Sequence, residues 1–292
     1  MQYLKKLGLI KEPFSSSPDP DFFYQSSKHN SVLNRLLLEI ENRQGLCVVL
    51  GNIGTGKTTL SRKLFQRLSS DQTLISHMIL DPAYESERVF LEHLVRIFKI
   101  DMSYYKESSC SSNLLFDYKD AIKNYLFEEV FENEKNVVLI IDEAQKMPQH
   151  TLEILRTFLN YESNQYKLLQ LILLGQMEFL QTLKKMENFT DRITYRDTID
   201  PLNRIETEEM IKFRFRRASL RDDLHDLFFT NEAIDDIYHY SKGHPRKINN
   251  ICHESLLLML VHEREKVDRE LTDEAIANLK VWGKNNEYQE IL

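Results

Sequence analysis

The sequence contains few residues that break helices, with 8 glycines and 7 prolines in 292 residues. Their scarcity excludes a collagen-like or linker-dominated chain and favours a helix-rich protein. Hydrophobic residues make up 42% of the chain. That share is enough to build a core and excludes a wholly disordered protein. The length corresponds to about two domains.

Cysteine is also scarce. Cys47, Cys110 and Cys252 lie far apart and form no CxxC pair. Neither a disulfide framework nor a cysteine-built zinc site is therefore expected, and a reducing compartment fits the sequence best. The nine histidines show no HExxH pattern or paired metal-ligand spacing.

Long hydrophobic runs and an excess of positive charge are missing as well. The longest apolar runs, such as residues 256–261, have about six residues, against the ~20 that span a bilayer. Residues 1–14 have no apolar stretch of signal-peptide length. We expect a cytoplasmic protein that reaches the inner membrane only through a partner. The net charge of -7 argues against a basic nucleic-acid-binding domain, although an oligomer could gather a local basic patch.

Short apolar runs alternate with helical patterns in the middle of the chain. The apolar runs cover residues 46–50, 74–80, 137–141 and 168–174, and the helical patterns cover residues 31–43, 57–69, 86–99, 114–134 and 149–163. Continuous apolar runs are typical of strands buried on both faces. Their alternation with helices predicts a parallel sheet in an α/β domain.

The ends of the chain differ from this middle part. Residues 1–30 interleave prolines with aromatic residues, which predicts an extended, ordered strap packed on the body. After Pro201 only helical patterns remain, near residues 206–219, 231–241, 245–263 and 272–282. The expected organisation is a strap (1–30), an α/β domain (31–201), a helical lid domain (202–283) and a tail (284–292).

A phosphate-binding loop follows the first apolar run. Gly51–Thr58 reads GNIGTGKT and fits the GxxxxGK[ST] pattern between a predicted strand and a predicted helix. Glycines allow a tight turn that directs backbone N–H groups at phosphate oxygens. Lys57 would reach the β and γ phosphates and the Thr58 hydroxyl would ligate Mg²⁺. The residues predicted to bind nucleotide are Gly51, Asn52, Ile53, Gly54, Thr55, Gly56, Lys57, Thr58 and Thr59.

An acidic pair follows the apolar run 137–141. Asp142 ends this predicted strand, where its carboxylate could hold Mg²⁺ directly or through water. Glu143 could orient and deprotonate the water that attacks the γ-phosphate. The alternative is that the pair caps the following helix. Beside a phosphate loop, an Asp-Glu pair indicates hydrolysis of a nucleoside triphosphate rather than binding alone.

These motifs and several others resemble AAA+ ATPases of the general secretion pathway protein A (ExeA) type and the related MSHA pilus-biogenesis ATPases. The same clade includes transposition ATPases similar to MuB, TniB and TnsC. The segments that carry the resemblance are Pro13-Phe14, Asp19–Tyr24, Ile141–Gln145, Leu173–Gln176 and Gly243–Asn249, within residues 3–262. The resemblance implies a P-loop NTPase of the AAA+ (ASCE) type. Such a protein has a five-stranded parallel sheet and a C-terminal all-helical lid.

The resemblance also implies roles for residues outside the two motifs. Gln176 would sense the γ-phosphate, with a helix-capping amide as the alternative. Arg192 would act as an arginine finger in a neighbouring subunit, with Arg196 as its rival and a surface salt bridge as the alternative. Arg246 would project from the lid onto the phosphates, and Pro245 suits the first turn of its helix. Phe14 and Tyr24 either pack in the core or border the adenine.

Two cellular roles stay open on the sequence. The resemblance implies an ATP- and Mg²⁺-dependent oligomeric switch, a ring or filament of identical subunits, that assists assembly of a secretion or pilus machine. Its partner would be a membrane component of that machine. The alternative is a DNA-binding transposition regulator that assembles on duplex DNA and recruits a transposase. A nucleotide-locked scaffold with negligible turnover is a third possibility, against which Glu143 argues.

Overall fold

The computed structural model describes residues 4, 6–15, 17, 19–103, 114–219 and 228–286, with side chains as far as residue 281. Cys110, the greater part of the serine-rich stretch 101–113 and most of the predicted tail lie outside the described residues. The chain divides into two compact units. We call them the sheet unit (His29–Asn52 and Leu60–Ile199) and the helical unit (Met1–Lys28, Ile53–Thr59 and Asp200–Leu292).

The sheet unit is built on five parallel strands in the order β2-β3-β4-β1-β5. The strands are β1 (Leu46–Gly51), β2 (Leu74–Ile79), β3 (Asn136–Ile141), β4 (Leu169–Gly175) and β5 (Ile193–Ile199). Every residue of β1, β3 and β4 is buried, as expected for continuous apolar runs in a covered parallel sheet. The predicted α/β class and the five-stranded parallel sheet are confirmed.

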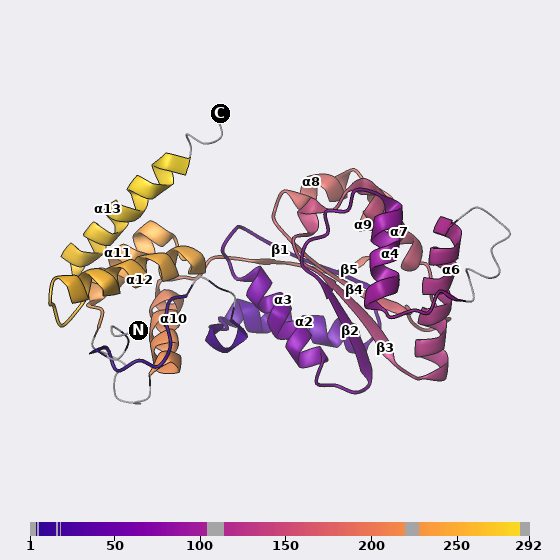
Figure 1. Cartoon of the computed structure of the whole chain (residues 1–292), viewed down its shortest axis with the longest axis horizontal. Helices are drawn as coiled ribbons and strands as arrows, with labels where there is room; N and C mark the ends of the chain where they lie inside the picture. Colours follow the sequence, from indigo (N-terminus) through magenta and orange to yellow (C-terminus); the bar gives the residue numbers. More distant parts are fainter. Residues whose placement is uncertain are drawn as a thin grey trace. The chain divides into compact units, whose positions relative to one another are not determined.

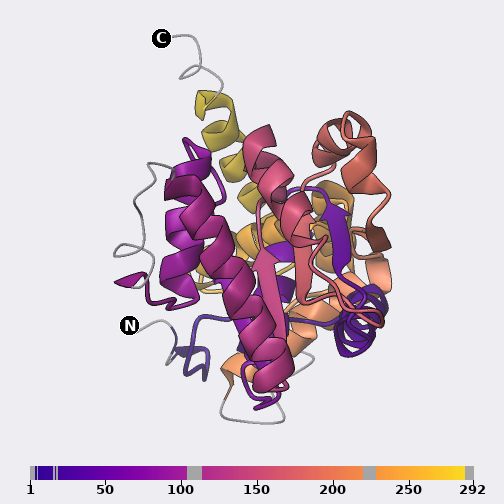
Figure 2. The same cartoon turned by 90° about the vertical axis from the view of Figure 1, so that its right-hand side faces the viewer.

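Helices cover both faces of this sheet. In Figures 1 and 2, α2 and α3 lie on one face, whereas α4, α6 and α7 lie on the other. The helices are α2 (Ser27–Glu41), α3 (Lys57–Leu68), α4 (Glu87–Ile97), α6 (Leu114–Phe127), α7 (Gln149–Phe158), α8 (Phe179–Lys184) and α9 (Glu187–Thr190), with the π-helical turn η2 (Glu128–Glu132) and the 3-10 turn η3 (Ala144–Lys146). Side chains that alternate along the strands, such as Val137, Leu139 and Ile141, share one core with α4, α6 and α7.

The edge strands differ from the sequence prediction. The run 74–80 was expected to be buried on both faces, but five of the six β2 residues are only half-buried. An edge strand has a neighbour on one side only, which leaves it more open. β5, with exposed Thr194 and Arg196, was not recognised as a strand from its residues because it has no apolar run. The short helices α8 and α9 were also missed.

The helical unit contains η1 (Pro20–Phe22), α10 (Arg204–Ala218), α11 (Asn231–Ser241), α12 (Pro245–Val261) and α13 (Arg269–Asn286). Asn203 and Glu206 form a reciprocal capping box that starts α10. The predicted helical region after Pro201 is confirmed.

The N-terminal segment packs into the core of the helical unit. Phe14 is 2% exposed and meets Phe215 edge-to-face at 5.3 Å. The Arg214 guanidinium donates hydrogen bonds to the carbonyls of Pro13 (2.6 Å), Phe22 (2.9 Å) and Ser15 (3.0 Å). Burial lowers the pKa of Arg214 to about 10, so the group stays charged at neutral pH. One buried cation therefore ties three backbone carbonyls of the segment to α10.

Candidate functional site

The phosphate loop connects β1 to α3. Gly54 and Gly56 have φ angles of 80° and 100°, in the left-handed region that non-glycine residues rarely adopt. α3 begins at Lys57, so the backbone N–H groups of its first turn have no partner within the helix. Lys57 is 5% exposed and Thr55 is fully buried. This is the local geometry that an anion-binding helix N-terminus requires.

Within the helical unit, the start of α12 contacts this loop. The Arg246 backbone N–H donates a 3.3 Å hydrogen bond to the Gly54 carbonyl. A Cβ at Gly54 would approach the Arg246 Cβ to 3.0 Å, so the glycine is needed for close approach as well as for its φ. Pro245 occupies the first turn of α12, and Arg246 is exposed. The structure therefore brings two sequence-predicted residues, Gly54 and Arg246, together.

In the sheet unit, Asp142 lies immediately after β3 and is 1% exposed. The Ser61 hydroxyl, from α3, donates to its Oδ2 at 3.2 Å. The backbone N–H of Glu143 donates to its Oδ1 at 2.9 Å. Two donors on this buried carboxylate satisfy both of its oxygens and fix its orientation. Sequence reasoning gave no role to Ser61, although it follows Lys57 by one helical turn.

Glu143 follows in a left-handed backbone conformation, with φ 53° and ψ 39°. Glutamate rarely adopts this conformation, and in this chain Glu134 and Glu263 share it with Glu143. The Gln145 side chain donates from Nε2 to Glu143 Oε2 at 2.7 Å. The Glu143 side chain makes no capping bond to the following 3-10 turn η3. That observation removes part of the support for the helix-cap alternative.

Gln176 lies at the end of β4. Its backbone N–H donates to Gln145 Oε1 at 2.9 Å, and its carbonyl accepts from Phe179 N at 3.0 Å. The N-cap residue of α8 is Glu178, and its side chain makes no hydrogen bond to the first turn of that helix. The Gln176 side chain therefore does not cap α8.

The two candidate arginine fingers differ in their contacts. Arg192 donates from Nε (3.2 Å) and Nη2 (2.8 Å) to Asn160 Oδ1, and from Nη1 to the Asn188 carbonyl. These contacts are to neutral oxygens and do not form a salt bridge. Arg196 on β5 is exposed, and within the described part of the chain its guanidinium has no hydrogen-bond or ion-pair partner.

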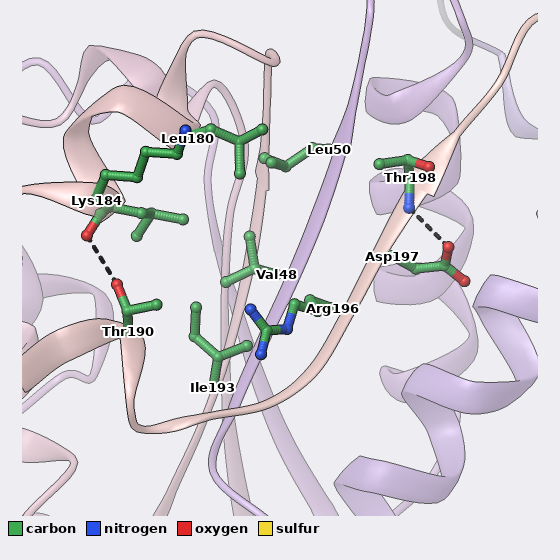
Figure 3. A pocket seen from close by; sticks show the side chains of 10 residues that line it. Val48, Leu50, Leu180, Lys184, Thr190, Ile193, Arg196, Asp197 and Thr198 are labelled. Atoms are coloured by element: carbon green, nitrogen blue, oxygen red, sulfur yellow. Dashed lines mark hydrogen bonds between the residues drawn. The ribbon is translucent and has the colours of Figure 1, made fainter. Parts of the chain in front are cut away.

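Arg196 borders a cavity of about 430 Å³ between β1, β5, α8 and α9. In Figure 3 its guanidinium points toward Val48 and Ile193, which with Leu50 and Leu183 form an apolar wall. The lining includes none of the residues predicted to bind nucleotide; Leu50, on β1, directly precedes them in the chain. This cavity is therefore separate from the residues predicted to bind nucleotide.

Comparison with known proteins agrees with this geometry. Residues 40–183 match the AAA domain family. General secretion pathway protein A of Aeromonas hydrophila is 33% identical over 91% of this chain and 46% of its own length. An uncharacterized HTH-type transcriptional regulator of Methanocaldococcus jannaschii is 27% identical over 66% of this chain and 47% of its own length. The chain thus spans about half the length of these curated relatives.

Solved structures show the same fold. The ORC2 protein of Aeropyrum pernix has a TM-score of 0.65 at 15% identity, covering 93% of this chain and 72% of that protein. The RuvB branch migration motor of Thermotoga maritima has a TM-score of 0.56 at 16% identity, covering 89% and 73%.

The parallel sheet, the phosphate loop and the helical C-terminal region define a P-loop NTPase of the AAA+ class. Within that class, residues 40–183 match the AAA domain family, and the chain is similar to general secretion pathway protein A over 91% of its own length. In the described residues, no helix is both long and apolar enough to cross a membrane.

Proposed function

We propose that the chain binds ATP with Mg²⁺ and hydrolyses it as an oligomer whose subunit contacts depend on the bound nucleotide. The arrangement at the end of β3 carries this proposal. There a buried Asp142, held through both carboxylate oxygens, is followed by Glu143 in a left-handed conformation.

The phosphate loop and Arg246 neutralise the charge of the triphosphate. Backbone N–H groups of residues 51–57 and the Lys57 ammonium bind the phosphate oxygens, and Thr59 lies in the same first turn of α3. The Thr58 hydroxyl and the Asp142 carboxylate are hard oxygen donors that fit Mg²⁺, directly or through water. Mg²⁺ held there would supply positive charge to the phosphate oxygens.

Glu143 activates the attacking water. The water oxygen forms the new bond to the γ-phosphorus while one water proton moves to the Glu143 carboxylate. The bond between the γ-phosphorus and the bridging oxygen breaks, and its electron pair leaves with ADP. Gln176 contacts the γ-phosphate, and an arginine from a neighbouring subunit, Arg192 or its rival Arg196, stabilises the charge that develops on it.

Replacing Lys57 tests this assignment. Lys57→Ala should weaken ATP binding by at least about 100-fold, because the triphosphate loses its direct cation. The measurement is titration of each variant with a fluorescent ATP analogue. Lys63→Ala is the matched control, since Lys63 lies on the same helix and contacts Gln66. Equal affinity in Lys57→Ala and wild type would contradict the phosphate-loop assignment.

The cellular role that the similarity supports is assistance in assembling a secretion or pilus machine. It rests on the 33% identity to general secretion pathway protein A, over 46% of that protein. The second candidate is ATP-dependent assembly on duplex DNA with recruitment of a transposase. The similarity to an HTH-type transcriptional regulator favours DNA as a partner.

Duplex-DNA binding by Glu143→Gln separates these roles. Binding that requires ATP and weakens steeply with salt indicates phosphate contacts along an assembled filament and supports the DNA role. ATP-driven oligomerisation without DNA binding, at any salt and with any nucleotide, supports the protein-partner role.

A further inference from the structure

One side chain connects the two strand ends that carry Glu143 and Gln176. Gln145 lies in η3, just after β3. Its side-chain amide both donates and accepts a hydrogen bond. Its Nε2 donates to Glu143 Oε2 at 2.7 Å, and its Oε1 accepts from the Gln176 backbone N–H at 2.9 Å. Each half of the amide therefore contacts a candidate functional residue.

The backbone around Gln145 leaves room for this bridge. A Cβ at Gly175 would come within 3.3 Å of Gln145 Oε1 and of the Ala144 Cβ. Any other residue at the end of β4 would therefore crowd both the bridging oxygen and the turn that carries it. Gly175 is thus a close-approach glycine for the Gln145 contact.

The direction of the hydrogen bonds matters for catalysis. The Gln145 amide donor occupies Glu143 Oε2 and leaves Oε1 to accept a proton. It also restricts rotation of the carboxylate, so that Oε1 keeps one orientation. Because the same side chain is held by Gln176 N, a displacement at the end of β4 changes the position of the Glu143 carboxylate.

We propose that Gln145 is a positioning residue for ATP hydrolysis that holds the Glu143 carboxylate in one orientation and couples it to the end of β4. This proposal rests on the proposed role of Glu143 as the residue that accepts the water proton. Gln145 itself touches neither the water nor the phosphate; it acts through Glu143.

Gln145→Glu is the most informative variant, because it keeps the shape and the oxygen that accepts from Gln176 N. It removes the donor to Glu143 and places a second carboxylate within hydrogen-bond distance. Two carboxylates at that distance share a proton, which raises the apparent pKa of the pair. Turnover at pH 7 should fall about 30-fold with ATP affinity within about 2-fold of wild type. The acid limb of the kcat profile should move to higher pH by about 1 unit.

Gln145→Ala loses the donor without adding charge. Its turnover should fall about 10-fold, and its acid limb should move less than in Gln145→Glu. If Gln145 had only a structural role, both substitutions would lower the folded fraction. The pH profiles of kcat for Gln145→Ala and Gln145→Glu would then not differ.

Gln170 supplies the matched control. It is 1% exposed at the start of β4, where its Oε1 accepts from Gly45 N at 2.8 Å and its Nε2 donates to the Lys167 carbonyl at 2.9 Å. Gln170→Glu should lower stability in urea but leave the acid limb of kcat unmoved. The same profile in Gln145→Glu and Gln170→Glu, at equal folded fraction, overturns the positioning role.

Glu143→Gln distinguishes failure of this inference from failure of the proposed function. If Glu143→Gln hydrolyses ATP at the wild-type rate, the proposed role of Glu143 is wrong. The proposed role of Gln145, which acts through Glu143, is then wrong as well. If Glu143→Gln is slow while Gln145→Glu keeps the wild-type rate and pH profile, only the role of Gln145 is wrong.

Discussion

The candidate phosphate-binding residues of the helical unit lie at the first turns of helices, whereas the candidate catalytic carboxylates of the sheet unit follow a buried strand. Lys57 starts α3, and Arg246 lies in the first turn of α12. Asp142 and Glu143 follow β3 and are held by Ser61, by backbone and by Gln145. Helix N-termini attract anions through backbone N–H groups. Side-chain hydrogen bonds fix the geometry of a reacting group.

This difference suggests a division of labour between the units. Substitutions in the helical unit should mainly change ATP affinity, because they remove charge that binds the substrate. Substitutions at the end of β3 should mainly change turnover, because the groups there are proposed to act in the transition state.

Loss of the arginine finger is expected to have an effect as large as that of any other substitution in the series. Arg192 and Arg196 are the two candidates, and each is replaced by Ala. The variant that lacks the true finger should lose turnover by about 1,000-fold while keeping ATP affinity. The other variant is the matched control. The measurement is steady-state ATPase activity combined with nucleotide titration.

Mixing experiments test whether the finger acts in trans. Activity should recover when the finger variant is mixed with Glu143→Gln, because some sites then combine an intact Glu143 with an intact arginine. Near wild-type turnover in both arginine variants, or no recovery at any mixing ratio, would contradict a finger supplied by a neighbour.

The sequence predicted the phosphate loop, the acidic pair and the central strands because each is encoded locally. GxxxxGK[ST] specifies its own turn, and Val137–Ile141 is apolar throughout. The hydrogen bonds that hold the site residues in place could not be predicted from the sequence. Ser61 meets Asp142 across 81 positions and Gln145 meets Gln176 across 31 positions, and only the folded sheet determines these pairs. β5 lacked the apolar run by which the other strands were recognised.

Arg214 tests the internal stability of the helical unit. Arg214→Met keeps most of the buried volume but leaves the carbonyls of Pro13, Ser15 and Phe22 without their donor. The free energy of unfolding in urea should fall by about 3 kcal/mol. Arg216→Met, an exposed position on the same helix, should change it by less than about 0.5 kcal/mol. Similar losses in both variants would mean that the three carbonyl bonds contribute little.

Arg246 gives the smallest expected effect of the series. Arg246→Ala should weaken ATP binding about 10-fold, since the cation proposed to contact the phosphates is lost while the backbone bond to Gly54 stays. Titration with a fluorescent ATP analogue gives the affinity, and Lys247→Ala, the exposed next residue, is the control. A change in turnover with unchanged ATP affinity would mean that Arg246 acts in catalysis. That result would contradict the proposed difference between the two units.

Glu143→Gln tests the division of labour most directly, through its ATP affinity and its single-turnover hydrolysis rate measured on the same preparation. The side chain keeps its size but can no longer accept a proton from water. Affinity should stay within about 2-fold of wild type while the single-turnover rate falls about 1,000-fold. Hydrolysis at the wild-type rate, or loss of binding with an unchanged single-turnover rate, would contradict a catalytic role for the end of β3.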